Sequence, residues 1–176
     1  MFENLNKSIA KVLSAYAVPE EAIAVFWEVV IELVDLLPNG WKIAWGSLSG
    51  CSSNAGKDRL LGATCPMIKY VVIDLGYLCN LFRITRVPAK GTFKFKIWKW
   101  MLKSIIKIFV RHEFRHANQF EYLEKHGVPW WAAFLAESKT PYMDQVCEKD
   151  ARAFQYFGIA QSLGSAMKPI IKMVRG

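Results

Sequence analysis

Two of the three histidines in the chain stand four residues apart in the segment 111–119, which reads R-H-E-F-R-H-A-N-Q. Side chains at positions i and i+4 of a helix lie on one face, so His112 and His116 can both reach a single metal ion. Glu113 follows the first histidine and would face whatever else that ion holds. The spacing therefore indicates a candidate metal centre with a carboxylate beside it.

A catalytic zinc bound by an H-E-x-x-H pair keeps three protein ligands and one water, so a third ligand must lie elsewhere in the chain. The remaining histidine, His126, lies ten residues after His116 and next to the expected helix end, too far along to join the pair. Glu148, in the run C-E-K-D-A-R-A-F, is the better candidate, on a second helix that crosses the first. Asp150 competes with it, but the two side chains point about 200° apart around a helix, so only one can face the ion. Ala151 provides the small side chain that a close helix crossing requires.

The histidine pair lies in a long helical pattern over residues 95–125, which contains no Gly or Pro. Apolar residues cover one side of this helix, and a basic residue recurs every four positions on another side. We expect this basic stripe to be a solvated face; the alternative is a surface for nucleic acid, an acidic partner or a membrane. The stripe consists of Lys99, Lys103, Lys107, Arg111 and Arg115.

Shorter elements must position this helix. Apolar spacing of three and four residues predicts helices over 4–17, 20–37, 130–137 and 142–162. Alternating or continuous apolar runs predict strands over 41–45, 68–75 and 81–87, with a loop over 46–66. The tail 165–175 is either a last helix or a frayed end. Together these patterns predict a mostly helical α+β fold with a small sheet of about three strands and one long helix.

Length and composition indicate a single globular domain over residues 1–176, with 53% hydrophobic and 22% charged residues. No apolar run reaches the roughly 18 to 20 residues that span a bilayer, and the first residues lack the features of a secretory signal. We therefore expect no transmembrane segment and an intracellular, cytoplasmic location. The four cysteines form no C-x-x-C pair, which predicts reduced thiols. The formal charge of +8 favours anionic partners.

The run H-E-F-R-H-A-N-Q-F, followed about thirty residues later by E-K-D-A-R-A-F, resembles the glutamate-zincins. These are metallopeptidases with H-E-x-x-H and a downstream glutamate ligand, and the resemblance is strongest to small forms found in bacteria and their phages. It covers about a third of the chain. The resemblance implies a zincin-like domain that binds Zn²⁺ through His112, His116 and Glu148. It also implies that Glu113 acts as general base in the hydrolysis of a peptide or protein substrate.

Two supporting roles are left open by the sequence. No histidine follows His126 to stabilise the oxyanion, and residues near Glu148 in the sequence could supply the donor instead. Candidates for the donor are Tyr142, Arg152 and Tyr156. Candidates to orient the metal ligands are Asn118, Gln119 and Asp150.

Two other classes of function compete with the peptidase hypothesis. The positive charge and the basic stripe are compatible with a nucleic-acid-binding protein whose metal is structural. The missing oxyanion histidine is compatible with an interaction protein on a zincin-like scaffold that has weak or no peptidase activity.

Overall fold

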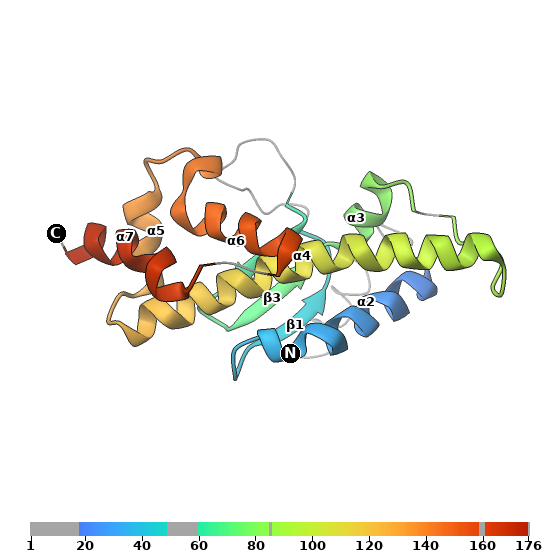
Figure 1. The fold of residues 1–176 in the computed structure, drawn as a ribbon, viewed down its shortest axis with the longest axis horizontal. Helices are drawn as coiled ribbons and strands as arrows, with labels where there is room; N and C mark the ends of the chain where they lie inside the picture. The colour runs from blue at the N-terminus through green and yellow to red at the C-terminus, as the bar shows by residue number, and fades with distance from the viewer. Residues whose placement is uncertain (1–17, 49–59, 85, 159–160, 176) are drawn as a thin grey trace, which may run out of the picture.

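A computed structural model describes residues 18–48, 60–84, 86–158 and 161–175, and one long helix, α4 (Phe93–Lys125), runs through it (Figure 1). Thr92 starts α4 by accepting a hydrogen bond from the Phe95 amide, and Gly127, with φ of +69°, follows its end. At about 1.5 Å per residue this helix is roughly 50 Å long. The mostly helical α+β fold with a three-stranded sheet confirms the predicted fold class.

The other elements pack along α4 in two groups. The first comprises α2 (Glu20–Leu33), the 3-10 turn η1 (Val34–Leu36), β1 (Lys42–Trp45), β2 (Gly62–Cys65), β3 (Tyr70–Ile73) and α3 (Leu75–Leu81). The second comprises α5 (Trp130–Glu137), the 3-10 turn η2 (Tyr142–Asp144), α6 (Val146–Phe157) and α7 (Leu163–Arg175). The helix predicted over 4–17 and Cys51 lie outside the described residues.

The sheet has the strand order β1-β3-β2 and is mixed. β1 runs parallel to β3 with Ile43 opposite Val71, and β2 runs antiparallel to β3 with Thr64 opposite the same valine. Two of the three predicted strands are therefore confirmed, but the third strand is β2, inside the segment predicted as a loop. Its small residues carry no recognisable strand period.

The strand predicted over 81–87 is wrong. Leu81 is the last residue of α3, and a turn with Arg83 at φ of +53° follows it. Asp74 explains the error, because its side chain accepts a hydrogen bond from the Tyr77 amide and so starts a helix directly after β3. The apparent alternation of apolar and polar residues comes from the end of this helix and the turn.

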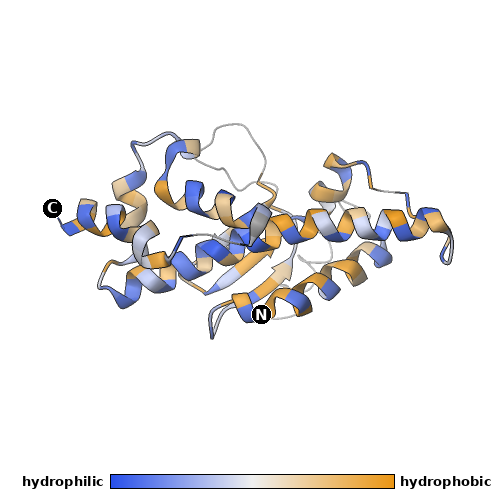
Figure 2. Ribbon diagram, viewed as in Figure 1, coloured by the Kyte–Doolittle hydropathy of each residue, from blue (hydrophilic) through white to orange (hydrophobic). Residues whose placement is uncertain are grey.

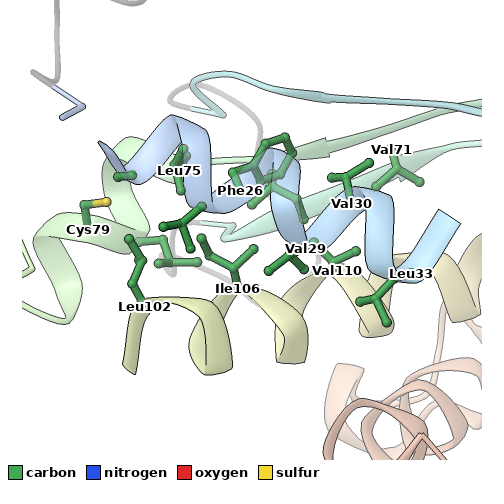
Figure 3. Packing of buried hydrophobic residues seen from close by; sticks show 14 of the residues in the cluster. Phe26, Val29, Val30, Leu33, Val71, Leu75, Cys79, Leu102, Ile106 and Val110 are labelled. Atoms are coloured by element: carbon green, nitrogen blue, oxygen red, sulfur yellow. The ribbon is translucent and has the colours of Figure 1, made fainter. Parts of the chain in front are cut away.

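The main hydrophobic core lies between α4, α2, α3 and the sheet (Figure 3). The apolar face of α2 and the inner face of α4 meet there, and each fully buried side chain contributes about 1.5–3 kcal/mol. Figure 2 shows these faces as orange bands along both helices. Residues of this core include Phe26, Val29, Val30, Leu33, Val71, Leu75, Leu102, Ile106 and Val110.

A second cluster holds the C-terminal helices against the other half of α4. It contains Leu123 of α4 and Met167 and Ile170 of α7, all fully buried.

The predicted helix 142–162 is shorter than expected, because Gln145 is extended and separates η2 from α6. The tail forms a helix, α7, rather than a frayed end.

The basic stripe of α4 is not a free solvated face, which corrects the prediction. Lys99 Nζ lies 2.6 Å from Glu28 of α2, Lys107 Nζ lies 2.6 Å from Glu32, and Lys103 also pairs with Glu32. Arg115 is buried. The three lysines of the stripe are therefore partnered by α2, and Arg115 pairs with Asp150 of α6, so most of the stripe is a contact between helices. Among the described helices, none has the length and apolar character needed to cross a membrane.

Candidate metal centre

Two helices bring the three predicted metal ligands together. His112 and His116 lie on α4, Glu148 lies in the first turn of α6, and their ligand atoms are all within 4.8 Å of one another. The two Nε2 atoms are 3.1 Å apart, and the Glu148 carboxylate oxygens lie 3.4 Å from His112 Nε2 and 3.2 Å from His116 Nε2. Ala151 is fully buried beside them, in the manner expected for the close crossing of α4 and α6.

Side-chain amides fix the orientation of both imidazoles. Gln119 Oε1 lies 2.8 Å from His116 Nδ1, and Gln155 Oε1 lies 2.9 Å from His112 Nδ1. The amide nitrogen of Gln119 donates to the Cys147 carbonyl and to Asp150, so the amide oxygen accepts a hydrogen bond from His116 Nδ1. His116 therefore donates through Nδ1 to Gln119, and its Nε2 faces His112 and Glu148, where the neutral ring would offer a lone pair to a metal ion.

The predicted ligands lie close together, and this shifts the pKa values of Glu148 and His116. Burial alone would raise the pKa of Glu148, but its hydrogen bonds with His112 and His116 hold that pKa well below the usual range. Burial lowers the pKa of His116, and the hydrogen bond and charge of Glu148 outweigh this effect and raise it to about 9. Glu148 Oε2 is buried 3.4 Å from His112 Nε2, and no well-aligned hydrogen bond reaches it from a described residue. A cation between the three groups would satisfy all of them at once, so the residues fit a metal ion.

Glu113 lies on the same helix and is also buried. The Thr64 hydroxyl donates a 2.7 Å hydrogen bond to Glu113 Oε2. Gly62, two residues earlier on β2, leaves the space that the carboxylate occupies, because a Cβ at this glycine would lie 2.5 Å from Glu113 Oε1. β2 thus holds the carboxylate from one side. Sequence reasoning missed both residues, since the segment was predicted to be a loop.

A cavity of about 360 Å³ opens beside these groups. β2 borders it with Gly62, Ala63 and Thr64, and the predicted ligands His116 and Glu148 lie in its wall together with Glu113. In the described part of the chain, β2 pairs only with β3, so its other edge is not hydrogen-bonded to a strand. The remaining wall is mainly apolar and includes Phe120, Ala133, Phe134 and Cys147.

Of the three candidate oxyanion donors, Tyr142 is the one in the wall of this cavity. Burial, the charge of Glu148 and a hydrogen bond with Glu148 raise the pKa of Tyr142, so the phenol keeps its proton. Arg152 lies 3.9 Å from Glu148 and donates to the Met143 carbonyl. Tyr156 is 60% exposed and does not line the cavity.

The structure also sorts the residues proposed to support the ligands. Asp150 does not reach the metal centre and accepts hydrogen bonds of 2.6 and 3.0 Å from Arg115. Through Gln119 it is linked to His116, so Gln119 and Asp150 hold that ring as the sequence suggested. Asn118 instead donates to the Leu36 and Phe114 carbonyls.

Two further residues complete the description of the centre. Sequence reasoning missed Gln155, although it lies seven positions after Glu148 and so on the same face of α6. His126 is exposed at the end of α4, where its Nδ1 lies 2.8 Å from the Tyr122 carbonyl, and it takes no part in the centre. Burial raises the pKa of Cys147 well above its usual value, which keeps this thiol protonated beside the cavity.

Comparisons of this chain with protein-family models, with curated proteins and with solved structures give no match. Its function must therefore be argued from the geometry of the centre and the cavity.

Proposed function

We propose that this chain is a zincin-like zinc metallopeptidase, in which His112, His116 and Glu148 hold the metal and Glu113 is the general base. One observation carries the proposal. Three side chains that can each offer a ligand atom converge beside a cavity that also receives a separately held carboxylate. A purely structural metal site would need neither the cavity nor the fourth group.

The donor set supports zinc as the metal. Two neutral imidazoles and one carboxylate are the ligands of a class of catalytic zinc site that leaves one position open. Zinc bound there would lower the pKa of a bound water toward about 7 and polarise a substrate carbonyl.

The residues of the chain would handle the protons and charge of the reaction. Glu113 would take a proton from the attacking water and pass it to the leaving amine. Thr64 orients the carboxylate for this role through its 2.7 Å hydrogen bond. Tyr142, held protonated in the cavity wall, would donate a hydrogen bond to the charge that develops on the carbonyl oxygen of the substrate.

The border of the cavity supports an extended peptide as the substrate. β2 presents an edge without a strand partner in the described part of the chain, and extended peptides bind such edges through main-chain hydrogen bonds. The apolar wall formed by Phe120 and Phe134 offers space for a hydrophobic side chain next to the metal centre.

Metal content and peptide cleavage, measured together on matched variants, test this proposal. The purified chain should hold about one zinc ion, Glu148→Ala should lose it, and Glu113→Gln should keep it while cleavage of a mixed peptide library falls roughly 100-fold or more. His126→Ala is the matched control and should retain both properties. A chain that binds no zinc, or a Glu113→Gln variant that cleaves peptides normally, would overturn the proposal.

A further inference from the structure

The first turns of α4 carry a second apolar face that points away from the core. Phe93, Ile97, Trp100 and Met101 follow each other at helical spacing and are 76%, 43%, 70% and 46% exposed. On the opposite side of the same turns, Leu102 is fully buried in the core. We call the four exposed residues the apolar stripe. One apolar face is enough to pack a helix on the core. A second, exposed apolar face on the same turns therefore indicates a contact with a partner outside the described structure.

The apolar stripe continues onto the end of α3. Phe82 is 43% exposed and borders, with Arg83, Ile97 and Met101, a hollow of about 260 Å³ between the two helices. Figures 1 and 2 show that this part of α4 lies at the end of the molecule opposite α7 and carries orange residues. The surface is therefore contiguous and lies at the tip of the molecule.

The sequence segment that carries the apolar stripe is strongly basic. Between Asp74 and Glu113 the sequence contains no acidic residue and nine Lys or Arg residues. Four of these pair with glutamates of α2. Four others are exposed and form no ion pair with a described residue: Arg83, Arg86, Lys94 and Lys96. At about 100° per residue, Lys94 and Lys96 lie on either side of the apolar stripe.

We propose that this tip docks on the surface of an anionic lipid bilayer. The apolar stripe would enter the boundary between headgroups and acyl chains, where Trp and Phe side chains are favoured, and the flanking cations would contact acidic headgroups. Aliphatic residues such as Ile97 and Met101 suit acyl chains and give no stacking surface to nucleic-acid bases. A second copy of the chain would bring the unpaired cations of two tips together, so charge complementarity favours the membrane.

The docking surface is separate from the metal centre. His112 and His116 follow the apolar stripe on the same helix, and at about 1.5 Å per residue they lie roughly 20–30 Å farther along its axis. None of the four residues of the apolar stripe lines the cavity. Membrane docking rests on different residues from the proposed peptidase function, so either can fail without the other.

Vesicle co-sedimentation of the full chain tests the proposal. The chain should bind vesicles with about a third phosphatidylserine, bind pure phosphatidylcholine vesicles far less, and release as salt rises. Lys94→Gln with Lys96→Gln should lower binding roughly 25-fold, at roughly fivefold per cation. Phe93→Ser with Trp100→Ser should lower it roughly tenfold or more. Zinc content should be unchanged in both double variants.

The matched controls lie on the other half of the molecule. Lys168→Gln with Lys172→Gln removes the same charge from exposed positions of α7, and Trp131→Ser removes an aromatic side chain that is 54% exposed on α5. Both controls should bind like the unmodified chain. Membrane docking would be overturned if the controls lost as much binding as the test variants, or if the chain bound neutral vesicles equally well. It would also be overturned if the chain bound a single-stranded DNA oligomer more tightly than the anionic vesicles. A dimer that Phe93→Ser with Trp100→Ser converts to a monomer would overturn it as well.

Discussion

Gly62→Ala should abolish catalysis without removing the metal. An added Cβ would lie 2.5, 2.7 and 2.8 Å from Oε1, Cγ and Cδ of Glu113, all well inside van der Waals contact. Three overlapping atoms cannot be relieved by turning the carboxylate, so the whole side chain must move away and lose its hydrogen bond with Thr64. The three atoms nearest to this Cβ all belong to Glu113 and none to a predicted metal ligand.

The expected magnitude follows from the role proposed for Glu113. A displacement of about 1 Å in a reacting group costs roughly 100-fold in rate, and the loss of general-base catalysis costs 10²–10⁴-fold. We therefore expect kcat for a reporter peptide to fall at least roughly 100-fold, with zinc content near one per chain and little change in KM.

Gly46→Ala is the matched control for this prediction. Its added Cβ would meet only Val72 Cγ1 at 3.8 Å, an ordinary contact, so activity should be retained. Full activity in Gly62→Ala would refute the placement of Glu113 as the base. Loss of zinc in Gly62→Ala would instead show that β2 supports the ligands rather than the carboxylate.

The surroundings of His116 determine how tightly the centre binds zinc and how the metal-free fold responds to pH. Gln119→Leu should weaken zinc binding roughly 10- to 100-fold in a chelator competition, whereas Asn118→Ala should leave it unchanged, because the first holds the His116 ring and the second does not. Zinc binding near pH 7.5 should release close to one proton, visible as a buffer-dependent heat in calorimetry, because Glu148 raises the pKa of His116 to about 9 in the metal-free protein. Protonated His116 should stabilise the metal-free fold fully below about pH 6.5 and lose that effect as the pH rises through about 9. Thermal unfolding of chelator-treated protein should show this decline between the two values, and the zinc-loaded protein should not.

The parts that could be predicted from the sequence are those set by local periodicity. The absence of Gly and Pro over residues 95–125 and the spacing of His112 and His116 define both α4 and two of the three converging ligands. The geometry of a helix also separates Glu148 from Asp150, and the structure places the first with the histidines and the second with Arg115. The fixed rotation of about 100° per residue around a helix is enough to decide which side chains share a face.

The parts that could not be predicted depend on contacts between distant segments. β2 is short and consists of small residues. The role of Gly62 and Thr64 depends on their contacts with Glu113, about fifty positions away, which no local pattern shows. The lysines of α4 resembled a free basic face, because a helical pattern does not show that Glu28 and Glu32 of α2 lie against them. Tertiary packing decided both outcomes.

Anomalous diffraction from a zinc-loaded crystal would test the metal centre itself. We expect one anomalous peak about 2.0–2.1 Å from Nε2 of His112 and His116 and about 2.0–2.2 Å from a Glu148 oxygen, with Glu113 outside bonding distance of the metal. The same crystals of Glu148→Ala should lose the peak. A peak at another group, such as Cys147, or no peak at all, would contradict the proposed zinc site and the peptidase function built on it.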